Sequence, residues 1–143
     1  MLPLLTRIHH VGIACHDLDE RISFYVSIFG LTVAHTEVNE GQGVREAMLD
    51  IGDSFVQLLE PTRADSAVAR FLMRNGEGVH HIGYAVDDVA DALEALAAKD
   101  IRLVDERPRH GSMGASIAFL HPKSVGGVLT ELIQTELIQT PGR

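Results

Sequence analysis

The chain has 143 residues, of which 45% are hydrophobic and 22% are charged. These values are typical of a globular protein and exclude a disordered or collagen-like chain. The formal net charge is −8, which disfavours broad electrostatic binding to nucleic acid or to an anionic membrane. We therefore expect no nucleic-acid or membrane partner, whereas a small anionic ligand would need only a local basic patch.

Cys15 is the sole cysteine, which excludes an internal disulfide and a cysteine zinc site. The first five residues, MLPLL, lack the basic start and the apolar length of a signal peptide. No segment of the sequence reaches the roughly 18 apolar residues that a membrane span needs. The sequence therefore predicts a cytoplasmic protein.

The chain contains an internal repeat. HHVGIACHDL at 9–18 matches HHIGYAVDDV at 80–89, so each residue lies 71 positions before its match. Farther along, SFVQLLE at 54–60 matches the segment around GVLTELI at 127–133 at an offset of 74, which places Gln57 on Glu131. Two matches in the same order indicate a duplicated module. A second, tandem repeat places TELIQ at 130–134 and again at 135–139, so Glu131 and Glu136 compete for any role of that motif.

The first module predicts a strand, a helix and three further strands. We expect strands at about 7–15, 31–38, 44–51 and 54–60, because these segments are apolar and β-prone. Asp17 with Glu20 resembles a capping box at a helix start, and Gly30 can end that helix. The apolar residues at helical spacing are Ile22, Tyr25, Val26 and Phe29. Gly52-Asp53 predicts a two-residue hairpin turn.

The second module predicts the same order. Asp88 caps a helix whose apolar face carries Val89, Leu93 and Leu96, and strands follow at about 101–105, 115–121 and 127–134. A helix at about 65–75 connects the modules. The expected fold class is α+β, with two tandem βαβββ modules in a single domain over residues 1–143. Module one spans about 6–62, module two about 78–134, and a tail covers 135–143.

Four polar residues lie at equivalent positions in otherwise apolar strands. His10 and His81 fall in the first strand of each module, and Gln57 and Glu131 in the last. An unpaired buried polar group costs about 1–3 kcal/mol, so these residues need partners. Two modules related by pseudo-twofold symmetry can bring all four to one point. Two imidazoles and two oxygen donors suit Co, Mn, Fe, Ni or Zn, and a six-coordinate ion would keep two open positions for catalysis.

These residues carry a family resemblance. The duplication with its His, Gln, His and Glu positions resembles the vicinal-oxygen-chelate superfamily, which includes glyoxalase I and the extradiol dioxygenases. The family whose motifs are similar over about residues 6–134 is methylmalonyl-CoA epimerase; the motifs are IHHVGIACHDLD, VNEGQGVREAML, VQLLEP, NGEGVHHIGYAV, GSMGASIAFLHPK and GVLTELI. The resemblance implies a cupped, partly open mixed β-sheet with the helices outside. His9 departs from it, because relatives often carry Asp there.

The resemblance also implies a metal and a reaction. His10, Gln57, His81 and Glu131 would hold one divalent ion, with Co expected in vitro and Mn, Ni, Zn, Fe or Mg as alternatives. The enzyme would interconvert (2R)- and (2S)-methylmalonyl-CoA, in propionate metabolism, by moving the C2 proton through a metal-stabilised enolate. Glu46 is implied as one base and Glu131 as the other, although a ligated carboxylate is a poor base and a relayed water is an alternative.

An acyl-CoA substrate brings phosphates, which favour a basic segment. Arg107, Arg109 and Lys123 lie in a stretch without acidic residues, and the run His110–Gly114, which includes Ser112, offers backbone N–H groups. These residues are candidates for substrate contacts; an ordinary solvated loop is the alternative. Because relatives are commonly dimers, a homodimer is expected.

Three other functions compete. An extradiol dioxygenase needs two His and one carboxylate for iron, which His10, His81 and Glu131 supply, but Gln57 and Glu46 are then unexplained. Glyoxalase I also moves a proton, although bacterial glyoxalases more often carry Glu at the position of Gln57. A non-catalytic binding protein of the superfamily would lack the metal ligands.

Overall fold

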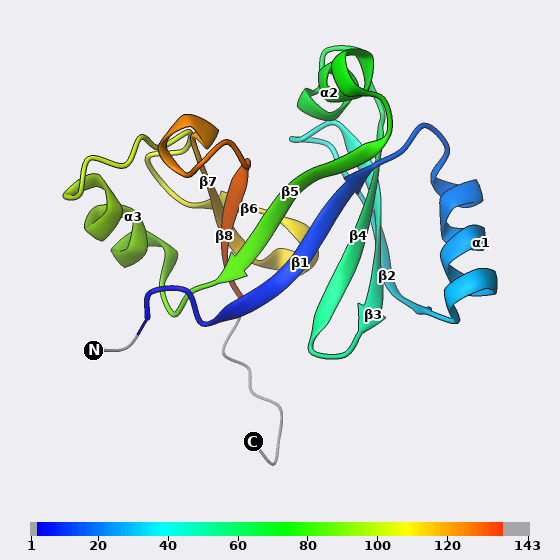
Figure 1. Cartoon of the computed structure of the whole chain (residues 1–143), viewed down its shortest axis with the longest axis horizontal. Helices are drawn as coiled ribbons and strands as arrows, with labels where there is room; N and C mark the ends of the chain where they lie inside the picture. Colours follow the sequence, from blue (N-terminus) through cyan, green and yellow to red (C-terminus); the bar gives the residue numbers. More distant parts are fainter. Residues whose placement is uncertain (1–2, 136–143) are drawn as a thin grey trace. The chain divides into compact units, whose positions relative to one another are not determined.

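The computed structural model describes residues 3–135, which form strands, three α-helices and two short 3-10 turns (Figure 1). The elements are β1 (Arg7–Ala14), α1 (Leu18–Phe29), β2 (Thr32–Asn39), β3 (Val44–Ile51), β4 (Ser54–Pro61), α2 (Ala67–Asn75), β5 (Gly78–Ala85), α3 (Val89–Ala97), β6 (Arg109–His110), η1 (Ser112–Gly114), β7 (Ser116–Leu120), η2 (Pro122–Ser124) and β8 (Thr130–Gln134). The hydrogen-bonded strand order is β2-β3-β4-β1-β5-β8-β7-β6. β1 pairs with β4 in parallel, whereas β3 pairs with β4 antiparallel. The predicted α+β class with a mixed sheet is confirmed.

The chain divides into two compact units, each with cores of its own. One unit is His9–Ile82, and the other runs from Gly83 onward and includes the N-terminal residues up to Ile8. In the His9–Ile82 unit the buried core residues form two clusters: Cys15, Leu18, Ala47, Leu49 and Leu58 in one, and Ala14, Val44, Leu59, Val68 and Leu72 in the other. In the other unit they are Val86, Val89, Ala92, Leu93, Ala118, Leu120 and Leu132, with a second cluster of Ala115, Ile117, Phe119 and Ile133. No helix within residues 3–135 is long and apolar enough to cross a membrane.

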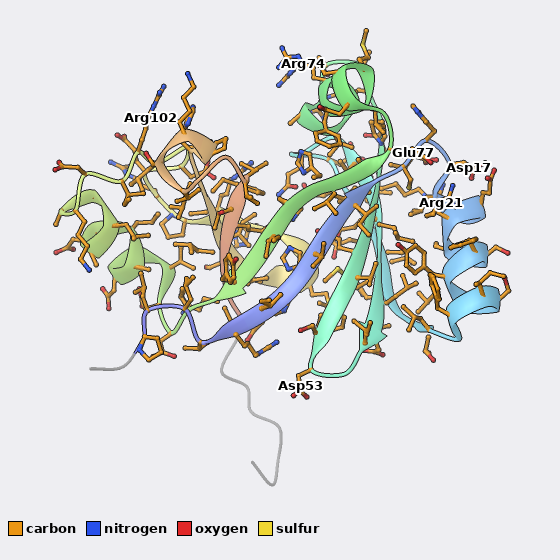
Figure 2. All side chains as sticks on the ribbon, in the orientation of Figure 1. Asp17, Arg21, Asp53, Arg74, Glu77 and Arg102 are labelled. Carbon is orange, nitrogen blue, oxygen red and sulfur yellow. The ribbon has the colours of Figure 1, made fainter. Side chains whose placement is uncertain are left out.

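The predicted helix ends of the first module are confirmed. Asp17 is the N-cap of α1, and its Oδ1 accepts a hydrogen bond from the Glu20 backbone N–H at 3.0 Å. Gly30 ends the helix in the left-handed region, with φ +71°, which glycine adopts without the Cβ penalty. Figure 2 shows Asp17 and Arg21 at the start of α1 beside Glu77. Glu77 accepts from the His16 N–H at 2.8 Å and from Arg21 Nη2 at 3.3 Å, so it fixes the entry to α1.

The apolar face of α1 is narrower than the sequence predicted. Ile22 and Tyr25 pack against the buried core, but Val26 and Phe29 are 42% and 59% exposed. Each helical residue turns the side chain by about 100°, so Val26 lies at the edge of the face that Ile22 and Tyr25 bury. Phe29, the last helical residue, packs its ring on Phe24 and Tyr25.

The remaining elements of the first module follow the sequence closely. Gly52 has φ +59° and joins β3 to β4, with Ile51 opposite Ser54, so the predicted tight hairpin is confirmed. The connecting helix α2 starts two residues later than predicted. Its N-cap is Ser66, whose side chain accepts from the Ala69 N–H at 3.1 Å.

The second module departs from the sequence prediction at its second strand. Residues 101–105 form no strand: Leu103 makes an isolated bridge with Leu120, and the short β6 lies farther along. The Asp105 carboxylate accepts from the Phe119 N–H at 2.9 Å, so a side chain takes a bond that a strand partner would otherwise make. β8 begins at Thr130 rather than 127, because Gly126 and Gly127 bend the chain at positive φ.

The module bounds and the single-domain assignment stay predictions. The tail at 135–143 lies, from Glu136 onward, outside the described residues.

Replacing the α1 cap should destabilise the protein. Asp17→Ala removes the acceptor for the Glu20 N–H, and we expect the free energy of unfolding to fall by about 1 kcal/mol. Urea unfolding followed by circular dichroism measures this change. Asp17→Asn keeps an acceptor oxygen and should lose much less; equal losses in the two variants would contradict the capping role.

Cys15 should be unreactive in the folded protein. Its Sγ donates to the Leu59 carbonyl at 3.5 Å, and burial, aided by Glu77 and Glu60, raises the pKa of the thiol from 9.0 to about 11. Because the thiolate is the reactive form, we expect labelling by an aromatic disulfide reagent at pH 8 only after unfolding. The unfolded thiol ionises first, so this group should lower stability as pH rises from about 9 towards 11. Native-state labelling as fast as that of the denatured chain would contradict this expectation.

Candidate metal centre and active site

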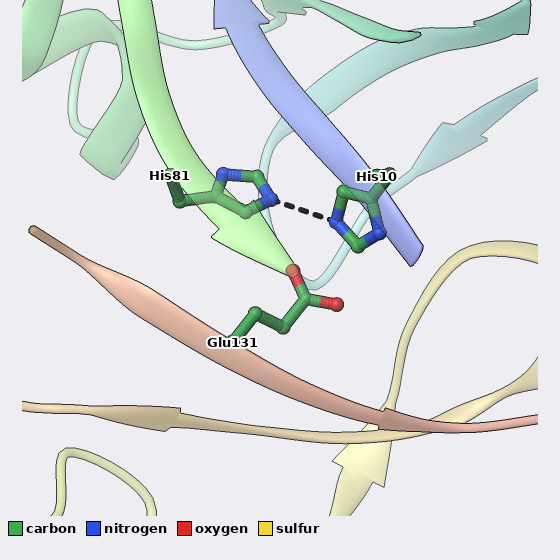
Figure 3. A group of neighbouring side chains, drawn as sticks. All are labelled: His10, His81 and Glu131. Atoms are coloured by element: carbon green, nitrogen blue, oxygen red, sulfur yellow. Dashed lines mark hydrogen bonds between the residues drawn. The ribbon is translucent and has the colours of Figure 1, made fainter. Parts of the chain in front are cut away.

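Two of the predicted ligands meet in the His9–Ile82 unit. His10 on β1 and His81 on β5 are both buried, at 1% and 3% exposed. Their Nε2 atoms are 3.0 Å apart, and Figure 3 shows the two imidazoles facing each other across this contact. The repeat explains the geometry, because equivalent positions of the two modules lie on neighbouring strands. The structure therefore brings together the histidines that the sequence paired.

The spacing of these nitrogens suits a shared metal ion. Imidazole nitrogens bind first-row divalent metals at about 2.0–2.1 Å. Two such ligands at right angles around one ion would be separated by about 3 Å, and the observed Nε2–Nε2 distance is 3.0 Å. A small rearrangement could therefore seat an ion between the rings, so the donor pair fits the metal that the sequence predicted.

Each ligand histidine also contacts the histidine that precedes it in the chain. The Nδ1 atoms of His9 and His10 are 2.8 Å apart, and those of His80 and His81 are 2.9 Å apart. Strand alternation predicts that neighbouring side chains point to opposite faces, which would turn His9 and His80 away from the ligand histidines. The contact is still made because Nδ1 lies only two bonds from Cβ. Sequence reasoning gave no role to His9 or His80, although the repeated HH doublet was a signal for both.

A second buried pair joins β3 to β4. Gln57 Nε2 donates to Glu46 Oε2 at 2.8 Å, and the two side chains are 6% and 1% exposed. The register explains the pairing: Met48 lies opposite Gln57, and Glu46 is two residues from Met48 on the same face. The structure thus connects the predicted amide ligand to the predicted base. The amide oxygen of Gln57 is the atom that this hydrogen bond does not use.

Gly12 brings the histidines and the Gln57–Glu46 pair together. It lies opposite Gln57 in the β1–β4 register and two residues after His10 on the same face. A Cβ built at this glycine would lie 2.2 Å from His81 Cε1 and 2.8 Å from its Nε2. Only the absent side chain lets the His81 ring approach the strand this closely, so His10, His81 and Gln57 adjoin one point.

The fourth predicted ligand belongs to the other compact unit. Glu131 is on β8, opposite Phe119 of β7, and is 5% exposed. Like His10 and His81, it is buried and offers one ligand atom to a metal ion; Figure 3 draws all three side chains. Glu136, the rival of Glu131 in the tandem repeat, lies outside the described residues.

The candidate substrate residues have different surroundings. Arg107, Arg109 and Lys123 are exposed, whereas Ser112 is buried in η1. Arg109 is already engaged: its Nε is 3.2 Å from Asp105 Oδ2, and its guanidinium lies 5.4 Å from the centroid of the Phe119 ring. The stretch without acidic residues begins at Arg107 and so leaves out Asp105, whose carboxylate offsets part of the positive charge of Arg109.

Comparison with known proteins identifies the family. The chain matches the model of the Glyoxalase/Bleomycin resistance protein/Dioxygenase superfamily over residues 9–119. It is 39% identical over 131 residues to the mitochondrial methylmalonyl-CoA epimerase of Homo sapiens, with 91% of this chain and 74% of that protein covered.

Solved structures agree with this match. A methylmalonyl-CoA epimerase in complex with methylmalonyl-CoA and NH4+ is 54% identical, has a TM-score of 0.90, and covers 96% of this chain and 99% of its own. A variant of the Streptomyces coelicolor methylmalonyl-CoA epimerase in complex with 2-nitronate-propionyl-CoA is 55% identical, with a TM-score of 0.88 and coverage of 92% and 98%. The chain therefore belongs to the methylmalonyl-CoA epimerase family of this superfamily.

Proposed function

We propose that this protein is a metal-dependent epimerase that interconverts (2R)- and (2S)-methylmalonyl-CoA. Family membership supports the substrate and the reaction. The observation that carries the proposal is the arrangement around Gly12, where a buried imidazole pair adjoins an amide that is hydrogen-bonded to a buried carboxylate. Three of the four proposed ligands and a candidate base thus occur in one unit.

The metal would be held by His10, Gln57 and His81, with Glu131 as the fourth ligand. Support comes from the donor types, from their equivalent places in the repeat and from the burial of all four side chains. A bound divalent ion supplies Lewis-acid stabilisation of the negative charge that develops when the C2 proton leaves. Two imidazoles and two oxygens suit Co, Mn, Fe, Ni or Zn, with Mg less favoured by nitrogen ligands.

Glu46 is the base that we propose for one face of C2. The hydrogen bond from Gln57 Nε2 to Glu46 Oε2 orients the carboxylate, and burial keeps it from bulk water. A base must be held within hydrogen-bond reach of the proton that it removes, and β3, paired on both sides by β2 and β4, fixes the backbone of Glu46. Glu131 is proposed for the opposite face, either directly or through a relayed water, because a ligated carboxylate is a weak base.

Contacts with the coenzyme A part of the substrate are proposed for Arg107, Arg109, Ser112 and Lys123. Exposed cations can reach phosphates in solution, and here they lie in a chain whose formal net charge is −8. Arg109 would have to exchange part of its contact with Asp105 for a phosphate. The homodimer and the cytoplasmic location stay predictions.

The Gln57–Glu46 hydrogen bond also favours epimerisation over oxygen chemistry. A dioxygenase iron site needs two histidines and one carboxylate and assigns no role to this buried pair. A positioned carboxylate is what proton transfer at carbon requires.

The proposal can be tested by isotope exchange. Metal-stripped protein is incubated with one epimer of methylmalonyl-CoA in deuterated water, with and without Co²⁺, and mass and stereochemistry are followed. We expect metal-dependent deuterium uptake at C2 with loss of stereochemical purity. Glu46→Gln and Glu131→Gln should each slow exchange by about 10²–10⁴-fold, whereas Glu94→Gln, at an exposed position of α3, should not.

The possible failures have distinct meanings. Protein that binds no divalent metal would disprove the metal site. Protein that binds metal but exchanges no deuterium would disprove the epimerase proposal and direct attention to oxygen uptake and glyoxalase substrates.

A side chain at Gly12 should disrupt the proposed metal site. In Gly12→Ala the new Cβ would overlap the buried His81 ring, which must move, and we expect Co²⁺ affinity to fall by at least about tenfold. Gly78→Ala is the matched control, because a Cβ there meets nothing within 4 Å and φ is not positive. Calorimetric titration with Co²⁺ measures both; unchanged affinity in Gly12→Ala would contradict the proposed role of His81.

A further inference from the structure

We propose that His9 and His80 are positioning residues that set the tautomer and ring orientation of His10 and His81. Each would accept a hydrogen bond from the Nδ1–H of the histidine that follows it, which leaves the Nε2 lone pair of that histidine for the metal. This inference rests on the proposed metal site, but it concerns two residues outside the predicted ligand set.

The four histidines form one continuous chain of ring contacts within the His9–Ile82 unit. The contacts run from His9 Nδ1 to His10 Nδ1 at 2.8 Å, from His10 Nε2 to His81 Nε2 at 3.0 Å, and from His81 Nδ1 to His80 Nδ1 at 2.9 Å. The chain is symmetric about its centre, because both outer contacts join the same atom types at nearly the same distance. The internal repeat therefore reproduces both the proposed ligand histidine and the preceding histidine that contacts it.

The single N–H of each neutral imidazole determines whether the outer histidines donate or accept. A neutral imidazole carries one N–H and one lone pair. If both central Nε2 atoms direct lone pairs at a metal, both central Nδ1 atoms carry the hydrogen. The Nδ1 atoms of His9 and His80 must then accept, and their own hydrogens lie on Nε2. Hydrogen bonding of this kind at the second ring nitrogen is how proteins commonly orient metal-bound histidines.

Without a metal, the same chain requires a different hydrogen pattern. The central contact needs one N–H, so either His10 or His81 donates to the other through Nε2. Because each neutral imidazole has one donor and one acceptor nitrogen, the three hydrogen bonds then all run in one direction, from one outer histidine to the other. One outer histidine then donates from Nδ1 and the other accepts. Metal binding therefore reverses the direction of one of the two outer hydrogen bonds, and the tautomer of His9 or of His80 changes when the ion is bound.

An aromatic ring supports each outer histidine. The His9 ring centroid is 5.3 Å from that of Phe55 on β4, and the His80 ring centroid is 5.1 Å from that of Phe71 on α2. His9 is 1% exposed and His80 is half-buried. These ring contacts restrict rotation of the outer imidazoles, so their Nδ1 atoms stay directed at the ligand histidines.

The first test uses the unaltered protein. Two-bond proton–nitrogen NMR spectra of ¹⁵N-labelled protein distinguish the two imidazole tautomers, before and after addition of Zn²⁺. We expect His10 and His81 to be protonated at Nδ1 in the zinc form, and His9 and His80 both to be protonated at Nε2. An Nδ1 hydrogen on either outer histidine in the zinc form would overturn the inference.

The second test measures metal affinity and the coordination spectrum in variants. His9→Phe and His80→Phe keep a ring but remove the acceptor, and each should weaken Co²⁺ binding by about 10–100-fold and alter the visible spectrum of the bound cobalt. His9→Asn and His80→Asn place an amide atom near the position of Nδ1 and should restore most of the affinity. His16→Phe is the control, because His16 is exposed and is not one of the four contacting histidines.

The outcomes separate the two proposals. If the parent protein binds no metal, the metal site and this inference both fail. If the parent binds metal but the Phe variants match it in affinity and spectrum, only the inference fails. If the Asn variants lose as much affinity as the Phe variants while remaining folded by circular dichroism, an acceptor placed near the position of Nδ1 does not restore binding, and the inference is also overturned.

Discussion

The hydrogen-bonded contact between His10 and His81 is the interaction on which the proposed site depends. Two imidazoles lie almost completely buried with their Nε2 atoms 3.0 Å apart, and buried polar groups are costly unless they find partners. The contact requires β1 and β5 to hold equivalent residues of the repeat side by side. Gly12 makes the close approach possible, since any side chain there would occupy the space of the His81 ring.

Ligation and proton transfer are proposed for different residues in one small region. The imidazoles supply nitrogen ligands, whereas the Gln57–Glu46 hydrogen bond connects a ligand amide to a carboxylate on the adjacent strand. A base held by a hydrogen bond from a neighbouring side chain keeps its geometry through the reaction.

The two modules have diverged where the proposed substrate contacts occur. The first keeps long regular strands, β2 to β4, and carries three of the five proposed ligand and base residues on strands β1, β3 and β4. The second replaces a strand by a loop that Asp105 holds through the Phe119 N–H. That loop leads to the exposed cations. Rigid strands are suited to hold reacting groups, while loops accommodate a large and variable ligand.

Much of this protein was determined by its sequence alone. The repeat paired His10 with His81 and Gln57 with Glu131, and the capping residues Asp17 and Gly30 fixed the ends of α1, because turns, caps and periodicity depend on neighbours a few residues away. Only the tertiary structure decided that Val26 is exposed, that residues 101–105 form no strand, and that His9 and His80 contact the ligand histidines. These outcomes depend on which strands pair and in what register, and on side-chain geometry, which the alternation of residues along a strand does not specify.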